Sequence, residues 1–288
     1  MRIALLGSNG QLGRDLQVAL TGHDISYYTR ADFDVVDHER TRAILQAAQP
    51  QIILNTTAYH RVDDCESQPE LAYSVNALAV LNLVRIANDS NATLVHFSTD
   101  YVFDGRSQSP YVEDSAPMPL SVYGNSKLAG EFLLRSTAKK FMLIRTCGLY
   151  GKAGSGGKGG NFLETMLRKA RSGESIRVVN DQVLTPTPTR ELAQQVAALI
   201  GANESGLFHI TSEGACSWYE FARAIFEIAG VKADLSPTTS DFYKTPALRP
   251  SYSVLENARL KAAGLNAMRR WRDGLADYLA SHETFRLA

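Results

Sequence analysis

The sequence is poor in the features that mark several functional classes. Its 288 residues hold only three cysteines, Cys65, Cys147 and Cys216, which are far apart and odd in number. That spacing fits neither a metal-binding motif nor a disulfide framework, so a reducing, cytoplasmic location is expected. The six histidines show no ligand spacing either, and no metal site is predicted.

An excess of one charge is also missing. Thirty basic and thirty acidic side chains cancel, which argues against a nucleic-acid partner and against a polybasic protein of the membrane surface. No run approaches the length of a membrane-spanning helix, and the apolar run 2–6 is too short for a signal peptide. Hydrophobic residues make up 44% of the chain, which is enough for a substantial globular core.

Short apolar runs alternate with helical patterns through the first half of the chain. The expected strands are 2–6, 24–29, 51–58, 92–99 and 141–146, and the expected helices are 13–20, 39–50, 69–90 and 123–138. Strands that alternate with helices in this way predict βαβ units. We therefore expect an α/β fold of the Rossmann type, which is a doubly wound parallel sheet with helices on both faces.

The texture of the sequence changes after Tyr150. Residues 151–160 hold six glycines, which is too flexible for an ordered element, and the segments that follow resemble a second, smaller α/β unit. We place a nucleotide-binding Rossmann domain at 1–150 and a mainly substrate-binding domain at 151–288. Part of the segment 182–205 is expected to rejoin the first domain.

Three glycines, Gly7, Gly10 and Gly13, lie between the first expected strand and the first expected helix. In a dinucleotide site the first permits a tight turn, the second lets backbone approach a pyrophosphate, and the third lets helix and strand pack closely. The helix N-terminus then presents free N–H groups to the phosphates. The pattern favours dinucleotide binding, and a purely structural turn is the alternative.

The choice between NAD and NADP is expected at the end of the second strand. An NAD site usually has an acidic residue there to hold the ribose hydroxyls, but this strand ends in Thr29 and Arg30. A guanidinium suits a 2′-phosphate. NADPH is therefore the expected cofactor, with NADH tolerated, and a solvated surface arginine is the alternative for Arg30.

Tyr123 and Lys127 are four residues apart, so on a helix they share one face. An ammonium beside a phenol lowers the phenol pKa from near 10 towards the working range, and such a tyrosine can exchange a proton with a carbonyl oxygen. The spacing also occurs by chance in many helices. Ser98 and Thr99 strengthen the hypothesis because they end an expected central strand, where open α/β sheets bind ligands; a turn or capping role is their alternative.

Several motifs together resemble those of the extended short-chain dehydrogenase/reductases, and within them the dTDP-4-dehydrorhamnose reductase family. The motifs run in order over nearly the whole chain and are the glycine turn, NTTAYHRVDDCE, VNA, STDYVFDG, SVYGNSK and RPSYSVLEN. The resemblance implies a Rossmann domain that binds NAD(P) and a small C-terminal domain that binds a nucleotide sugar. It also implies reduction of the 4-keto group of dTDP-4-dehydro-L-rhamnose to give dTDP-L-rhamnose.

The resemblance assigns roles to individual residues. Thr99 would polarise the keto oxygen, Tyr123 would donate the proton, and Lys127 would bind the nicotinamide ribose and tune the tyrosine. Substrate contacts are expected from Ser98, Tyr101 and Arg249. Cofactor contacts are expected from Gly7, Ser8, Asn9, Gly10, Gln11, Leu12, Gly13, Arg30, Asp37, Thr57, Ala58, Tyr59, Asn76, Tyr123, Lys127 and the pair Arg145-Thr146. Two of these residues have structural alternatives: Asn76 as a tie between backbone segments, and Arg249 as a structural arginine.

The chain departs from the family where an aromatic residue, often Trp, usually follows the Arg-Thr pair. Cys147 and Gly148 stand there instead, which leaves the sugar open. We expect Cys147 to be a buried thiol rather than a nucleophile, since no base lies near it in the sequence. The two tryptophans, Trp218 and Trp271, lie in helical patterns and are expected in the core.

Two other functions stay open at this point. One is another nucleotide-sugar epimerase or reductase of the extended family, and the other is a non-catalytic, cofactor-binding subunit like the regulatory subunit of methionine adenosyltransferase. Dehydratases of the wider family carry Asp-Glu after the active-site Thr. Here Asp100 is followed by Tyr101, which argues against a dehydratase. A homodimer is the default expectation. Some family members hold Mg²⁺ at a subunit interface, and this sequence gives no sign for or against it.

Overall fold

The structure is a computed structural model that describes residues 1–153 and 160–281. Most of the glycine-rich segment 151–160, expected as a loop, lies outside the described residues. The strands are β1 Arg2–Leu6, β2 Asp24–Tyr28, β3 Ile52–Asn55, β4 Thr93–Thr99, β5 Phe141–Thr146, β6 Leu149–Tyr150, β7 Ile176–Val179, β8 Val183–Leu184, β9 Thr187–Pro188, β10 Gly206–His209, β11 Cys216–Ser217 and β12 Leu235–Thr238. The α-helices are α1 Gln11–Ala19, α2 His38–Ala48, α3 Val62–Ser67, α4 Pro69–Tyr73, α5 Ala79–Asp89, α6 Val122–Thr137, α7 Phe162–Arg171, α8 Thr189–Gly201, α9 Trp218–Ala229, α10 Ala258–Ala262 and α11 Trp271–Ala280.

A six-stranded sheet forms the centre of the molecule, in the order β10-β5-β4-β3-β1-β2. Every neighbouring pair in it is parallel, which confirms the Rossmann-type α/β fold. The inner strands are buried along almost their whole length, because helices cover both faces of a parallel sheet. The strand order reverses direction between β1 and β3, so the crevice at their carboxyl ends is the expected ligand site.

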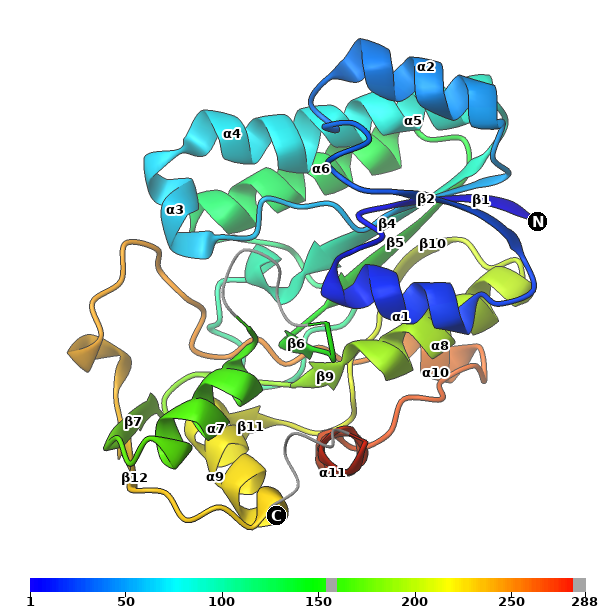
Figure 1. Cartoon of the computed structure of the whole chain (residues 1–288). Helices are drawn as coiled ribbons and strands as arrows, with labels where there is room; N and C mark the ends of the chain where they lie inside the picture. The colour runs from blue at the N-terminus through cyan, green and yellow to red at the C-terminus, as the bar shows by residue number, and fades with distance from the viewer. Residues whose placement is uncertain (154–159, 282–288) are drawn as a thin grey trace.

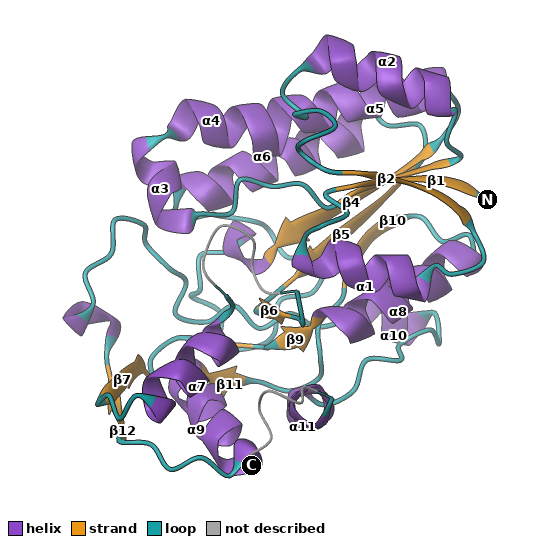
Figure 2. Cartoon of the chain, viewed as in Figure 1, coloured by secondary structure: helices purple, strands orange, loops and turns teal. Residues whose placement is uncertain are grey.

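Helices α1 and α8 cover one face of the sheet, and α2, α5 and α6 cover the other (Figures 1 and 2). Side chains alternate along each strand, so β1 sends Ile3 and Leu5 into the first layer and Ala4 and Leu6 into the second. Both layers therefore hold the sheet rigidly and fix where its strand ends lie.

The long helix expected at 69–90 is divided in the structure. Residues Pro69–Tyr73 and Ala79–Asp89 are α-helical, and the π-helical turn η1 (Ser74–Leu78) joins them. Such turns often occur at functional sites. By length and composition Pro69–Asp89 passes as a membrane span, but 56% of that window is buried inside the protein, as in a core helix.

The second half of the chain contributes to both parts of the molecule. Helix α8 packs along α1, and β10 adds to the edge of the sheet beside β5. Helices α7, α9 and α11 pack on a separate apolar cluster that includes Tyr150 and Phe221. These helices form a smaller unit below the carboxyl ends of the central strands (Figure 1).

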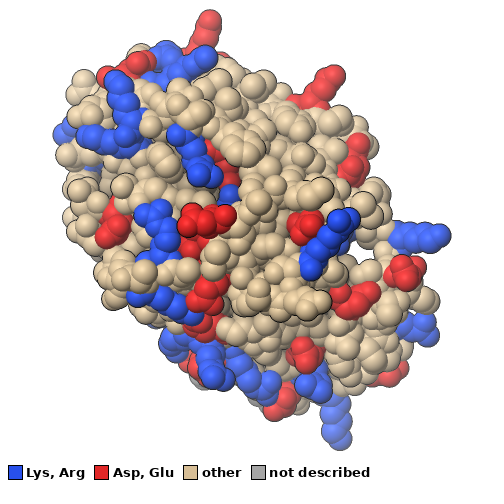
Figure 3. All heavy atoms as spheres, turned by 180° about the vertical axis from the view of Figure 1, so that it is seen from behind, with Lys and Arg blue, Asp and Glu red and all other residues tan. Residues whose placement is uncertain are grey.

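The surface carries both charges close together. On the face opposite that of Figure 1, Lys and Arg side chains lie among Asp and Glu side chains (Figure 3). Several of them form exposed ion pairs, for example Arg42 with Asp89 at 2.7 Å. Exposed pairs of this kind contribute little to stability, about 0–1 kcal/mol each.

Candidate active site

A cavity of about 660 Å³ lies between the carboxyl ends of the central strands and the smaller unit. Its walls carry the glycine turn, the ends of β4 and β5, the start of α6 and residues of the second half of the chain. This is the crevice that the strand order predicts, and its size suits a cofactor-sized ligand.

The glycine turn closes one end of this cavity. Gly7 has φ +76°, and a Cβ atom there would lie 2.6 Å from Thr56 Oγ1. A Cβ on Gly13 would lie 2.3 Å from the carbonyl oxygen of Gly7, whereas one on Gly10 would meet only that oxygen, at 3.2 Å. Glycine is thus required at 7 and 13 by the fold of the turn itself, and Gly10 leaves the cavity wall open, as a bound pyrophosphate would need.

Arg30 lies on the cavity wall beyond the end of β2. Its guanidinium pairs with Asp34 at 2.7 Å, and its side chain is 84% exposed. Since an exposed pair is weak, the guanidinium is available to a phosphate that enters this end of the cavity.

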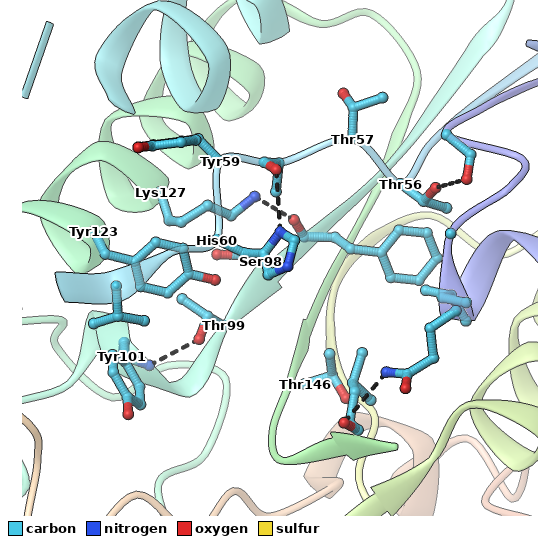
Figure 4. A pocket seen from close by; sticks show the side chains of 18 of the residues that line it. Thr56, Thr57, Tyr59, His60, Ser98, Thr99, Tyr101, Tyr123, Lys127 and Thr146 are labelled. Atoms are coloured by element: carbon cyan, nitrogen blue, oxygen red, sulfur yellow. Dashed lines mark hydrogen bonds between the residues drawn. The ribbon is translucent and has the colours of Figure 1, made fainter. Parts of the chain in front are cut away.

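Thr99, Tyr101 and Tyr123 come together at the end of β4 (Figure 4). The Thr99 hydroxyl lies close enough to Tyr123 to influence the pKa of its phenol, and Thr99 Oγ1 donates to Asp100 Oδ1 at 3.0 Å. The ring of Tyr101 packs edge-on against that of Tyr123, with the centroids 5.8 Å apart. Ser121 caps the N-terminus of α6 by accepting from the backbone N–H of Gly124, so Tyr123 is held in the first turn of the helix.

The expected lowering of the Tyr123 pKa by Lys127 is wrong for this structure. Burial raises the pKa of Tyr123 well above 10, and the neighbouring Thr99 side chain only partly opposes that shift. The reason is that Lys127 Nζ points into the sheet, where it donates to the carbonyl oxygen of Phe97 at 2.6 Å (Figure 4). Burial also lowers the pKa of Lys127 itself to about 8.

Three polar atoms on the cavity wall are buried without a hydrogen-bond partner among the described residues: Ser98 Oγ, Thr146 Oγ1 and Gln11 Oε1. Buried polar groups are normally paired. These three come from β4, β5 and the start of α1, so they mark places where a ligand can complete the hydrogen bonding.

Five of the expected site residues do not line the cavity. Ser8 is buried behind the turn, and Asp37 caps α2 by accepting from the backbone N–H of Arg40. Asn76 binds both the N–H and the C=O of Tyr59, which is the backbone tie given above as its alternative.

The other two of the five are arginines held in ion pairs. Arg145 is fully buried and forms two-pronged contacts with Glu131, and Arg249 pairs with Asp63 at 2.8 Å. Neither arginine lines the cavity itself, but the Arg249 side chain interacts with Tyr101, which does. The remaining expected residues line the cavity: Gly7, Asn9, Gly10, Gln11, Leu12, Gly13, Arg30, Thr57, Ala58, Tyr59, Ser98, Thr99, Tyr101, Tyr123, Lys127 and Thr146.

The structure adds wall residues from the second half of the chain, among them Gln182, Val183 and Trp218. Trp218 was expected in the core. It packs against Phe162 with the two rings tilted by 47° and their centroids 4.6 Å apart, but it is half-buried and also lines the cavity. No local pattern reveals these residues, because their place depends on how the smaller unit packs below the sheet.

Cys147 is confirmed as a buried thiol. Its Sγ donates to Asp100 Oδ2 at 3.0 Å, and burial together with the Asp100 carboxyl raises its pKa well above the usual range. A thiol held in its neutral form is a poor nucleophile. Burial also raises the pKa of Asp100.

No group of three or more His, Cys, Asp and Glu side chains that could hold a metal ion occurs in the described ranges 1–153 and 160–281.

Comparison with known proteins gives consistent results. Residues 1–284 match the family model described as the RmlD substrate binding domain. The chain is 36% identical to the dTDP-4-dehydrorhamnose reductase of Escherichia coli over 293 residues, 96% of each protein. It is 37% identical to the dTDP-4-keto-6-deoxy-D-glucose reductase of Streptomyces niveus over 278 residues, 95% of each.

Solved structures agree with these matches. The dTDP-4-dehydrorhamnose reductase of Bacillus anthracis, solved in complex with NADP, superposes with a TM-score of 0.93 at 35% identity. The alignment covers 98% of this chain and 99% of that one. The similarity therefore extends through both the sheet and the smaller unit.

Proposed function

Because the chain belongs to the RmlD substrate binding domain family, we propose that it reduces the 4-keto group of dTDP-4-dehydro-L-rhamnose to dTDP-L-rhamnose with NADPH. The observation that carries the proposal is the meeting of Thr99 and Tyr123 at the end of β4, on a wall that they share with the glycine turn. Two hydroxyl groups beside a dinucleotide-binding turn can bind and protonate a carbonyl oxygen while the cofactor donates a hydride, as carbonyl reduction requires.

The cavity fits a dinucleotide. The glycine turn leaves the backbone open at Gly10, the N-terminus of α1 points its N–H groups there, and Gln11 and Thr146 carry unpartnered buried oxygens. Arg30 at the far end matches a 2′-phosphate, which favours NADPH over NADH. When bound, the cofactor supplies a hydride to the substrate carbonyl carbon.

Tyr123 gives its phenolic proton to the O4 atom of the sugar, and the Thr99 hydroxyl turns its hydrogen from Asp100 Oδ1 to the same atom. Burial raises the pKa of Tyr123, so the phenol is protonated at neutral pH and ready to act as an acid. Its proton is replaced from solvent after each turnover. Ser98, with its unpartnered hydroxyl, lies beside Thr99 and completes the contacts to the reacting end of the sugar.

The nucleotide part of the substrate binds against the segment 151–288, where Gln182, Val183 and Trp218 line the cavity. The half-exposed Trp218 ring offers a flat surface on which a base or sugar can stack. Gly148, with φ +56°, lies on the cavity wall beside Cys147, and an added Cβ atom there would lie 3.0 Å from Pro186 Cα, so the fold itself favours glycine at this position. The three cysteines are buried and not joined by disulfides, which fits a cytoplasmic enzyme.

A direct assay tests this proposal. The purified protein with NADPH and dTDP-4-dehydro-L-rhamnose is expected to consume NADPH and form dTDP-L-rhamnose, identified by mass spectrometry and NMR. Faster turnover of dTDP-4-keto-6-deoxy-D-glucose would assign the sugar to that of the Streptomyces niveus relative. Conversion of a sugar without net oxidation of NADPH would indicate an epimerase, and cofactor binding without turnover of either sugar would indicate a regulatory subunit.

A further inference from the structure

His96 lies in the middle of β4, completely buried, and does not line the cavity. It is the central member of a chain of polar groups that runs from the β3 end to Lys127. Asn55 Nδ2 lies 3.1 Å from His96 Nδ1, and His96 Nε2 lies 3.3 Å from Lys127 Nζ. The side chains of all three residues are at most 2% exposed, so no water competes for these bonds.

The backbone N–H of Thr57 fixes the direction of the hydrogen bonds in this series of side chains, starting from Asn55. The backbone N–H of Thr57 can only donate, and it donates to Asn55 Oδ1 at 3.1 Å. The Asn55 side chain must therefore turn its NH₂ group towards His96 Nδ1, which accepts. A neutral imidazole that accepts at Nδ1 carries its proton on Nε2.

An Nε2–H group that faces Lys127 Nζ needs a lone pair to receive it. An ammonium has three donors and no acceptor, whereas a neutral amine has one lone pair and two N–H bonds. As the amine, Lys127 can accept from His96 and still donate to the carbonyl oxygen of Phe97. Every hydrogen-bonding group in the series Asn55, His96 and Lys127 then has a partner. An ammonium would instead place an N–H donor of Lys127 against the Nε2–H donor of His96.

The surroundings of Lys127 favour the amine. Among titratable side chains, His96 of β4 lies 3.3 Å from Lys127 Nζ, and Glu131 of α6 acts on the Lys127 charge. The negative charge of Glu131 favours the ammonium, but Arg145 takes both carboxylate oxygens of Glu131 in a fully buried ion pair. Desolvation is the largest influence on Lys127 and lowers its pKa.

We propose that His96 is a positioning residue for Lys127: in the cofactor-free protein its Nε2–H group binds Lys127 as the neutral amine and holds it away from Tyr123. This inference rests on the proposed role of Lys127 at the nicotinamide ribose. When the cofactor binds above pH 8, where the amine predominates, Lys127 takes one proton from solvent, leaves His96 and donates to the ribose as an ammonium. Under these conditions the positive charge reaches the neighbourhood of Tyr123 only when the cofactor is bound.

The first test needs neither cofactor nor turnover. Long-range ¹H–¹⁵N NMR of the cofactor-free wild-type protein at pH 9, where the Lys127 amine predominates, is expected to show His96 as the neutral Nε2–H tautomer, with its signals assigned by their loss in His96→Gln. The backbone carbonyl of Asn55 also lies near the imidazole and would accept from an Nδ1–H group. An Nδ1–H tautomer would leave Nε2 to accept from an ammonium and would overturn the proposal.

The second test is the pH dependence of NADPH binding, measured as the dissociation constant by fluorescence. Wild-type affinity is expected to fall about tenfold per pH unit above pH 8, because binding then takes up a proton. His96→Leu removes the donor that stabilises the amine and is expected to move this onset up by about half to one pH unit. His96→Gln, which returns an N–H donor, is expected to restore the wild-type onset.

His209→Gln is the matched control, because His209 is also fully buried but bonds to the Tyr111 carbonyl at 3.0 Å rather than to Lys127. It is expected to leave the onset where the wild type has it. An onset in folded His96→Leu equal to that in His209→Gln would make His96 merely structural. Since both tests need only the protein and NADPH, a protein that binds NADPH but reduces no keto sugar would refute the proposed function and leave this inference intact.

Discussion

Replacing Gly13 by Ala tests the structural role of the glycine turn separately from its role in binding the cofactor. The added methyl group would lie 2.3 Å from the carbonyl oxygen of Gly7 and 2.9 Å from Ser8 Cα. Both neighbours are backbone atoms, so the start of α1 must move away from β1. Overpacking of this kind costs about 1–3 kcal/mol, which lowers the melting temperature by roughly 2–4 °C per kcal/mol in a protein of this size.

Two further glycines make the experiment decisive. A methyl group on Gly10 meets only the Gly7 carbonyl oxygen, at 3.2 Å, so Gly10→Ala is expected to fold with nearly wild-type stability but to bind NADPH at least about tenfold more weakly. Gly201 ends α8 with nothing within 4 Å of an added methyl group. Gly201→Ala is therefore expected to be neutral or to gain up to about 1 kcal/mol.

Calorimetry and NADPH titration on the three variants provide the readout. The expected order of melting temperature is Gly201→Ala, then Gly10→Ala, then Gly13→Ala, with the specific loss of affinity in Gly10→Ala. A Gly13→Ala protein as stable as Gly201→Ala, or a Gly10→Ala protein with wild-type affinity, would refute this account of the turn.

Three other changes test the site. Tyr123→Phe is expected to keep its NADPH affinity while kcat falls at least about a hundredfold, and near-wild-type turnover would remove Tyr123 from the chemistry. Arg30→Ala is expected to weaken NADPH binding by about tenfold and leave NADH binding unchanged, as for one lost charge-assisted hydrogen bond; equal effects on both cofactors would contradict the 2′-phosphate contact. Burial lowers the pKa of Lys127 in the folded protein to about 8, below the ordinary lysine value of 10.5 that the unfolded chain keeps. Between these two values the unfolded chain binds more protons than the folded one, so wild-type stability rises with pH there, by about 3 kcal/mol in all. Lys127→Met is expected to be more stable than wild type at pH 7, with a difference in urea unfolding free energy that shrinks towards pH 10; a difference independent of pH would refute the burial of an ionisable amine.

Local signals in the sequence were sufficient for the parts of the site that lie on one strand or one turn. The glycine spacing predicts the dinucleotide-binding turn because the atoms that restrict each glycine belong to the turn itself or to the residues just after the adjoining strand β3. Thr99 could be placed because the end of a buried strand in a parallel sheet is where ligands bind. The spacing of Tyr123 and Lys127 correctly puts both on the cavity wall.

Contacts between distant segments account for what the sequence did not show. The direction of Lys127 Nζ depends on a carbonyl and an imidazole of β4, which no spacing within α6 can reveal. Arg145 lies near the carboxyl end of the buried strand β5, where a site residue is expected, but Glu131 of α6 neutralises it inside the protein. Trp218 has the pattern of a core residue and reaches the cavity only because α9 packs below the sheet.

The path of the hydride tests the central claim most directly. NADPH carrying deuterium at both C4 positions of the nicotinamide is mixed with the protein and dTDP-4-dehydro-L-rhamnose, and the sugar product is examined by NMR and mass spectrometry. The account predicts one deuterium atom at C4 of dTDP-L-rhamnose for each NADPH consumed. A product without deuterium, or deuterium at another carbon, would contradict it.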